Sequence, residues 1–201
     1  MIFEIIDISR DLLSSEIYPG DPKPEIGIFS AIKKGDECNM AKISTTLHCG
    51  THADAPLHFL PNGNSIGMAD MSAYIGECVV VEVNERRITG QYVDEHFPHG
   101  ADRVLIKSGG ISYLDHTGAE EISYLGYKLV GTDALSIGSS EDEARPHKAL
   151  LSENVAILEN LNLSHVKPGK YFLVAPPIKI AGVDAAPVRA LLLDGCIFWS
   201  N

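Results

Sequence analysis

Residues 78–83 read Cys-Val-Val-Val-Glu-Val, and residues 103–107 read Arg-Val-Leu-Ile-Lys. Unbroken runs of aliphatic and β-branched residues of this length are typical of strands that are covered on both faces. Similar runs occupy residues 129–131, 155–159 and 171–175. Because strands of this kind need a further layer on each face, the runs predict an α/β fold with a mixed sheet.

Short segments between these runs supply the other elements of the predicted fold. Residues 123–127 and 147–151 favour short helices. Clusters of Pro, Gly, Asn and Ser predict turns at residues 21–24, 61–64 and 138–140. Since no internal repeat and no low-complexity linker divides the chain, we expect one continuous domain over residues 1–201.

The composition argues against nucleic-acid-binding proteins and membrane proteins. The chain of 201 residues is 45% hydrophobic and has a formal net charge of −11, from 27 acidic and 16 basic residues. Because no cluster of Lys and Arg is available to follow a phosphate backbone, nucleic acid is not an expected partner. No run approaches the roughly 18 apolar residues of a membrane-spanning helix, and the first residues lack the basic region of a signal peptide. We therefore expect a cytoplasmic protein with no membrane partner.

The cysteines do not form a pattern that is typical of a disulfide framework or a zinc ribbon. No two of them form a CxxC pair, so we expect reduced thiols and no disulfide. The four cysteines are Cys38, Cys49, Cys78 and Cys196.

Three of the eight histidines and an aspartate fall within residues 48–58, which read HCGTHADAPLH. The spacing of His48 and His52 matches that of a helical zinc motif, but Cys49 replaces the Glu of that motif, and the residues that follow are poor helix formers. In an extended chain, alternate residues point to the same side, so both histidines and Asp54 would share a face. Because a straight strand would separate the two histidines by about 13 Å, we expect the chain to bend at Gly50.

Two imidazoles and a carboxylate are suitable ligands for zinc, manganese or iron(II). Three protein ligands leave one coordination position open for water, as catalysis requires. The alternative is a polar strand edge with incidental histidines. His58 lies beyond Pro56 and is either a proton-transferring residue, a further ligand or a loop residue.

Two residues later in the chain become candidates once a metal is assumed. Pro146 and His147 are typical of the start of a helix, where proline fits the first turn. Glu159 ends the apolar run of residues 155–158, where a carboxylate is costly to bury unless it is paired or bound to a cation. The alternative for Glu159 is an exposed strand end.

The pattern H-x-G-T-H-x-D-x-P-x-H at residues 48–58 resembles that of the cyclase-like metal-dependent hydrolases, which include bacterial kynurenine formamidases and isatin hydrolases. Segments at residues 18–21, 131–137 and 176–190 also resemble parts of this family, so the resemblance covers essentially the whole chain. It implies a swivelling β/β/α fold and a homodimer.

The resemblance also implies a set of metal ligands. His48, His52 and Asp54 would hold one divalent ion, and Asp54 would bridge to a second ion that His147 and Glu159 complete. The two ions implied are zinc, with manganese as the alternative.

The implied reaction is the hydrolysis of N-formyl-L-kynurenine to L-kynurenine and formate by metal-activated water. His58 would be the catalytic proton shuttle, and Tyr18 would contact the aromatic part of this small-molecule substrate. Two alternatives stay open: a hydrolase of a cyclic amide such as isatin or of another small acyl compound, and an inactive metal-binding protein. The sequence leaves three further residues undecided between structural and site roles: Asp133, Asp184 and Arg189.

Overall fold

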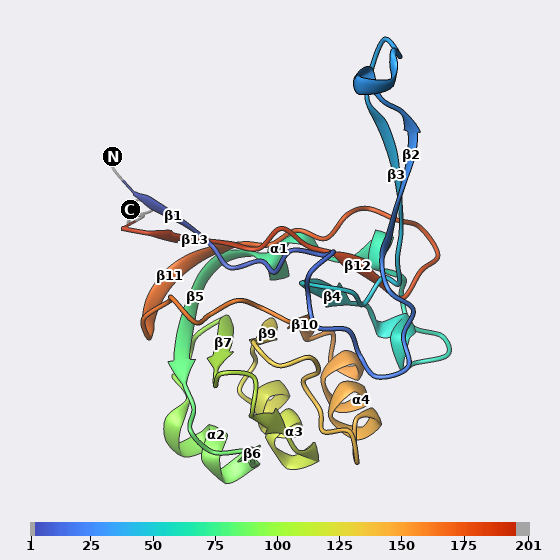
Figure 1. The fold of residues 1–201 in the computed structure, drawn as a ribbon. Helices are drawn as coiled ribbons and strands as arrows, with labels where there is room; N and C mark the ends of the chain where they lie inside the picture. Colours follow the sequence, from blue (N-terminus) through green and yellow to red (C-terminus); the bar gives the residue numbers. More distant parts are fainter. Residues whose placement is uncertain (1–2, 196–201) are drawn as a thin grey trace.

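A computed structural model describes residues 3–195, which fold around one curled, nine-stranded mixed sheet (Figure 1). The strand order is β1-β13-β11-β5-β7-β9-β10-β4-β12. The four central strands β5, β7, β9 and β10 are parallel, and the strands on both sides of them pair antiparallel. The strands are β1 (Glu4–Asp7), β4 (His52–Asp54), β5 (Ile75–Glu82), β7 (Arg103–Lys107), β9 (Leu129–Thr132), β10 (Ala156–Glu159), β11 (Gly169–Val174), β12 (Ala185–Pro187) and β13 (Leu191–Asp194).

Short helices and two small ribbons complete the described chain. The α-helices are α1 (Met71–Tyr74), α2 (Gly90–His96), α3 (His116–Tyr124) and α4 (Ala144–Ser152), and the 3-10 turns are η1 (Ile32–Lys34), η2 (Pro56–His58) and η3 (Ile66–Met68). Two-stranded ribbons are formed by β2 (Glu25–Ser30) with β3 (Met40–Ser44), and by β6 (Arg87–Ile88) with β8 (Tyr113–Leu114). Within the described residues, no helix is long and apolar enough to cross a membrane.

Both faces of β7, β9 and β10 are buried, as the unbroken apolar runs predict, whereas β5 alternates between buried and more exposed residues. In β7, Val104 and Ile106 pack into a core that includes residues of α2, α3 and α4, whereas Leu105 between them packs into a second core on the opposite face. Consecutive strand residues point to opposite faces, so a strand buried on both sides needs no polar alternation. Figure 1 shows the three helices together on one side of the sheet.

The predicted mixed α/β fold with short helices is confirmed, and its errors are local. All five predicted strands exist, and β7 has the predicted bounds. The helix predicted at residues 123–127 is wrong, because α3 begins at His116, where the Asp115 side chain accepts a hydrogen bond from the Gly118 amide and caps the helix. The helix predicted at residues 147–151 is α4, which begins three residues earlier.

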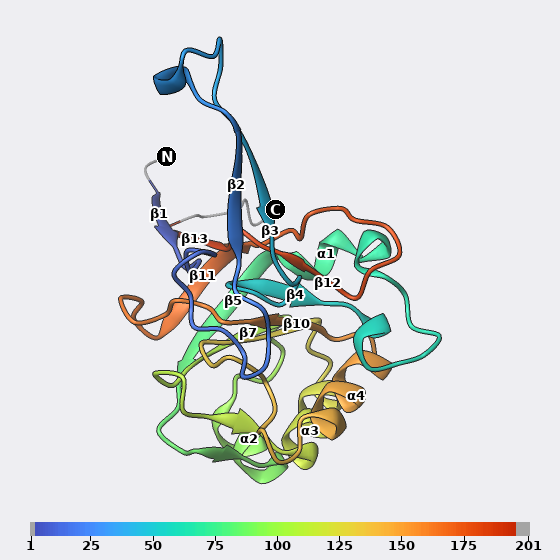
Figure 2. The same cartoon turned by 45° about the vertical axis from the view of Figure 1, so that its right-hand side comes forward.

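The β2–β3 ribbon, called the hairpin arm below, projects from the body of the molecule (Figure 2). Its two strands pack mainly against each other. The rest of the chain is arranged around the sheet, so the arm is the part of the described structure that extends furthest from it.

Candidate active site

Strand β4 brings two candidate ligands to one face of the sheet. His52 and Asp54 are two residues apart on β4, so their side chains point the same way. Antiparallel pairing with β10 places Glu159 directly opposite His52, where cross-strand side chains are neighbours. Sheet register therefore gathers an imidazole and two carboxylates at one place.

The predicted bend at Gly50 is confirmed. Gly50 has φ +67°, and a Cβ on it would lie 3.2 Å from the Leu12 Cα. This left-handed conformation favours glycine. The bend places His48 in the turn before β4 and within reach of Asp54, which a straight strand would not allow. The Gly50 carbonyl also accepts a 2.9 Å hydrogen bond from His52 Nδ1.

The two predicted histidine ligands of the first ion converge on one oxygen of the third predicted ligand, Asp54. Asp54 Oδ1 lies 3.1 Å from His48 Nδ1 and 3.5 Å from His52 Nε2. These three groups offer ligand atoms that all lie within 4.8 Å of one another. The arrangement is compatible with a single cation held by two imidazoles and a carboxylate.

The other oxygen of Asp54 faces a second group. His147, on the fourth position of α4, places Nε2 3.4 Å from Asp54 Oδ2 and 3.2 Å from Glu159 Oε1. These ligand atoms also lie within 4.8 Å of one another. Glu159 is only 4% exposed, so the alternative of an exposed strand end is wrong. Asp54 is thus shared by two triads.

The buried polar atoms of this cluster fit metal ions. His52 Nε2 and both oxygens of Asp54 are buried without a hydrogen-bond partner, although unpartnered polar atoms are rare in protein interiors. The ring nitrogens that point away from the cluster are hydrogen-bonded. His147 Nδ1 donates to the Glu143 carbonyl at 2.7 Å, and His52 Nδ1 donates to the Gly50 carbonyl at 2.9 Å. Fixing the outer N–H in this way leaves the inward nitrogen free as a metal ligand.

The charges of the cluster lead to the same conclusion. Burial opposes protonation of His48, yet the adjacent carboxylates of Asp54 and Asp184 raise its pKa to about 9. Burial likewise opposes the negative charge on Asp54, but the surrounding histidines hold its pKa well below the usual range. Protonated imidazoles thus supply the positive charge that the buried carboxylates need, and cations binding there would displace these protons.

His58 and Asp184 form an adjoining pair that the sequence did not connect. Asp184 Oδ2 lies 3.2 Å from His58 Nδ1 and 3.1 Å from His48 Nε2. Because a carboxylate only accepts, both rings donate to Asp184. In the neutral form of each ring, His58 Nε2 and His48 Nδ1 therefore carry no proton. One carboxylate thereby orients a candidate ligand and the candidate proton shuttle.

The cluster opens into a small cavity of about 160 Å³ whose lining includes Tyr18, Phe59 and Glu143. The Tyr18 hydroxyl donates to Glu143 Oε2 at 3.1 Å, and the Phe59 ring packs 4.5 Å from the ring of His147. Pockets for drug-sized ligands measure roughly 300–1,000 Å³, so this one can enclose only the reacting end of a substrate. Two larger clefts, of 460 and 610 Å³, lie at other places on the surface. Within residues 3–195, none of the groups of three possible metal ligands lines either of these clefts.

The undecided residues separate into different roles. Asp133 is structural, because its carboxylate accepts hydrogen bonds from the amides of Ser108, Gly109 and Gly110. Arg189 pairs with Asp7 at the surface. Among the cysteines, Cys38, Cys49 and Cys78 are free thiols, and Cys196 lies outside the described residues.

Sequence reasoning missed Glu143 and Phe59, and it left Asp184 undecided. A helical spacing of four residues from His147 is the signal that could have found Glu143, since residues four apart on a helix are neighbours.

Comparisons with known proteins place this geometry in a family. The Cyclase family, described as "Putative cyclase", matches residues 6–139. The chain is 36% identical to a kynurenine formamidase of Erythrobacter litoralis over an alignment of 204 residues, and this alignment covers 94% of each of the two chains. It is 33% identical to a kynurenine formamidase of Sphingopyxis alaskensis, over 94% of this chain and 98% of that one.

Solved structures agree with the fold. A protein described as a predicted metal-dependent hydrolase from Bacillus stearothermophilus superposes with a TM-score of 0.83 at 27% identity, over 96% of this chain and all of that one. Isatin hydrolase A from Labrenzia aggregata has the same fold, with a TM-score of 0.82 at 20% identity, over 96% of this chain and 94% of that one. The expected fold of the cyclase-like hydrolases is confirmed, and the chain belongs to the Cyclase family.

Proposed function

We propose that this chain is a metal-dependent amidohydrolase that cleaves N-formyl-L-kynurenine to L-kynurenine and formate, with residues 1–201 forming one catalytic domain. The observation that carries the proposal is the pair of buried triads that share Asp54. The kynurenine formamidases at 33% and 36% identity support the choice of substrate.

The two triads would hold two divalent ions, with zinc as the proposed metal and manganese as the alternative. His48, His52 and Asp54 would bind the first ion, and His147 and Glu159 would join Asp54 around the second. A divalent ion in such a site polarises a carbonyl oxygen and lowers the pKa of water. Both of these effects favour hydrolysis of an amide.

His58 would transfer the proton. Burial lowers the pKa of His58, so its ring is neutral near neutral pH and can accept a proton at Nε2, because Nδ1 donates to Asp184. During hydrolysis, the oxygen of water bonds to the formyl carbon and the carbon–nitrogen bond breaks. His58 takes a proton from that water and returns it to the aromatic amine, which is a poor leaving group as an anion.

The cavity suits a flat, compact reacting group. The aromatic rings of Tyr18 and Phe59 both line it, and aromatic side chains stack on flat rings such as that of a formanilide. We propose Tyr18 as the residue that contacts the aromatic part of the substrate.

An assay on two substrates tests the proposal. Purified protein loaded with zinc or manganese would be given N-formylkynurenine and isatin side by side, before and after removal of the metal with a chelator. We expect turnover of N-formylkynurenine that is lost with the metal and restored by its return. Turnover of isatin alone would replace the substrate, and bound metal without hydrolysis of either amide would favour a binding protein.

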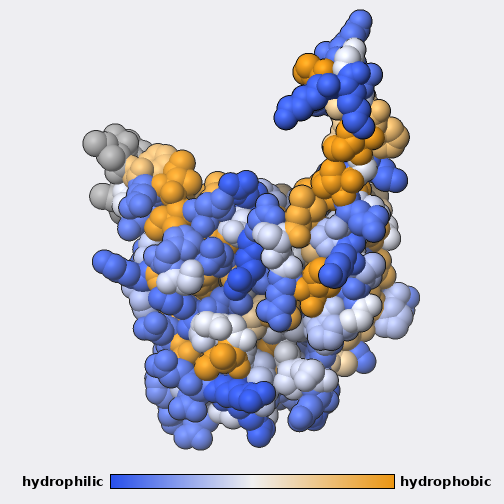
Figure 3. Space-filling view, in the orientation of Figure 1, coloured by the Kyte–Doolittle hydropathy of each residue, from blue (hydrophilic) through white to orange (hydrophobic). Residues whose placement is uncertain are grey.

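We also propose that the chain is a homodimer, as the family resemblance implies. The apolar residues exposed on the hairpin arm support this assembly (Figure 3).

A further inference from the structure

The cavity over the two triads has a buried end and a rim. His52, His147 and Glu159 at the buried end are almost fully enclosed. Apart from the two histidines already described, the side chains that line the rim are only partly buried, and they are Tyr18, Asp21, Phe59, Leu135 and Glu143. Two of these are carboxylates, and neither belongs to a ligand triad found in residues 3–195. They can therefore serve a part of the substrate that does not react.

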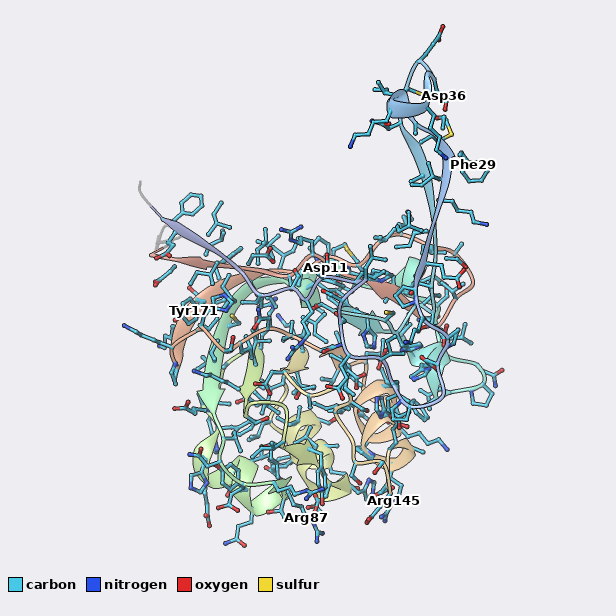
Figure 4. The ribbon with its side chains drawn as sticks, in the orientation of Figure 1. Asp11, Phe29, Asp36, Arg87, Arg145 and Tyr171 are labelled. Carbon is cyan, nitrogen blue, oxygen red and sulfur yellow. The ribbon has the colours of Figure 1, made fainter. Side chains whose placement is uncertain are left out.

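The carboxylate of Glu143 has little use in the fold. Glu143 immediately precedes α4, yet its side chain does not cap that helix. Within residues 3–195 its side chain accepts one hydrogen bond, from the Tyr18 hydroxyl. Arg145, the nearest cation along the chain, pairs with Asp142 instead, and Figure 4 shows it at the end of the molecule away from the hairpin arm. Because a carboxylate has about four acceptor positions, Glu143 has room for a further donor.

The rim is negatively charged. No Lys or Arg is among the residues that line this cavity in the described part of the chain. Burial raises the pKa of the Tyr18 hydroxyl, and the adjacent carboxylate of Glu143 raises this pKa further, with smaller contributions from Glu159 and Asp21. A shift in this direction is expected where negative charge is concentrated. Such a rim attracts a cationic group and repels an anionic one.

Helix α4 fixes the rim relative to the metal ligands. The Glu143 carbonyl accepts a 2.7 Å hydrogen bond from His147 Nδ1, so one turn of chain holds both residues. His147 lies at the buried end of the cavity, whereas the Glu143 side chain reaches Tyr18 at the rim. A substrate whose carbonyl lies among the triads would therefore extend past Tyr18 and bring its far end to Glu143.

We propose that Glu143 determines specificity by accepting hydrogen bonds from an aliphatic ammonium group at the far end of the substrate. This inference rests on the amidohydrolase proposed above and names the class of formanilide that it prefers. N-formylkynurenine carries such a group on the chain that leaves its ring beside the formamide. Its α-carboxylate would point to solvent, since the lining residues include no Lys or Arg. Neutral isatin would gain nothing from this contact.

Glu143→Gln tests the inference, because it removes the charge and keeps an oxygen that can accept from Tyr18. Zinc-loaded wild type and variant would each be given N-formylkynurenine and an analogue in which hydrogen replaces the ammonium. We expect wild type to prefer the ammonium compound by about 10–100-fold in kcat/KM, the usual contribution of a charged hydrogen bond. Glu143→Gln should lower this ratio by at least about tenfold. The loss should appear in KM, because a contact far from the reacting carbon is made equally in the ground state and the transition state.

Glu141→Gln is the matched control. Glu141 lies two residues earlier, is exposed and does not line the cavity. This variant should keep the wild-type ratio.

Calorimetry separates the inference from the proposed reaction. The affinities of kynurenine and of its analogue without the ammonium would be measured on the same proteins, which needs no hydrolysis. If wild type hydrolyses neither formanilide but binds kynurenine more tightly, and Glu143→Gln loses this difference, the proposed substrate is wrong and the role of Glu143 holds. A wild type with no preference for the ammonium in either measurement, or a Glu143→Gln variant that keeps the wild-type preference, would overturn the inference whether or not the protein is a formamidase.

Discussion

The β4 strand and the hairpin arm depart from the ordinary rule of burial in opposite directions. β4 buries an imidazole and a carboxylate, with His52 and Asp54 each only 1% exposed. The arm exposes isoleucines, with Ile28 60% exposed. Each departure is costly for an isolated chain, because buried charge and exposed apolar surface both need a partner. The comparison teaches that the two regions need different completions: the buried charges of β4 need the cations proposed for the site, and the exposed isoleucines of the arm need a surface that covers them.

The largest expected effect comes from removing the charge that the two triads share. Asp54→Asn should lose both ions and lower turnover by more than about 10³-fold, since both triads lose the carboxylate that they share. Elemental analysis and the formamidase assay measure the two effects. Asp142→Asn is the matched control, because Asp142 pairs with Arg145 at the surface and should change neither. Retention of two ions by Asp54→Asn would show that the site does not need the shared carboxylate.

The next effect separates proton transfer from metal binding. His58→Ala should keep its metal content and lower turnover by about 10²–10⁴-fold, which is the usual contribution of a positioned acid or base. Metal analysis together with single-turnover kinetics checks this. Wild-type turnover in the variant would remove His58 from the mechanism.

The affinity of the site for metal should rise as pH rises. In the metal-free protein, burial opposes protonation of His48, but Asp54 and Asp184 raise its pKa to about 9, whereas a metal ligand must be neutral. Binding therefore releases this proton below about pH 9, so the affinity for metal should rise with pH by up to about tenfold per pH unit for this proton, and more steeply where His52 and His147, whose pKa values are also raised, release theirs. Calorimetry in two buffers of different ionisation enthalpy measures the released protons. An affinity that falls as pH rises would contradict this account.

The smallest expected effect comes from Asp184, whose carboxylate accepts hydrogen bonds from His48 and His58. Asp184→Ala should weaken metal binding or turnover by about 10–100-fold, as expected for an outer hydrogen-bond partner of a ligand. Asp184→Asn keeps an acceptor oxygen and should recover part of the loss. Metal competition titrations and kcat, measured separately, distinguish the effects on His48 and His58. Equal losses in both variants would show that the negative charge, and not the acceptor, is what matters.

Prediction from sequence works where a residue's role depends on its near neighbours. The run at residues 103–107 predicts β7, because strands buried on both faces require continuous apolar sequence. The cluster at residues 48–58 predicts the bend and the convergence of His48, His52 and Asp54 for the same reason: Gly50 lies between the two histidines. By contrast, α3 was misplaced, because its start depends on the single capping residue Asp115.

Roles that depend on distant residues escape prediction. Asp184 lies 126 residues from His58 along the chain and meets it only because the segment before β12 passes beside η2. The apolar run before Glu159 indicates only a costly buried charge, and it took the family resemblance to name Glu159 as a ligand. The register of β10 against β4, which brings Glu159 to His52, is visible only in the structure. The strands β2 and β3 were missed because sequence reasoning concentrated on unbroken apolar runs, whereas these strands alternate.

Anomalous diffraction from crystals grown with zinc tests the central claim most directly. The account predicts two peaks, one among His48, His52 and Asp54 and the other among Asp54, His147 and Glu159, with Asp54 contacting both. The absence of any peak at these residues, with their side chains turned away from one another, would contradict it.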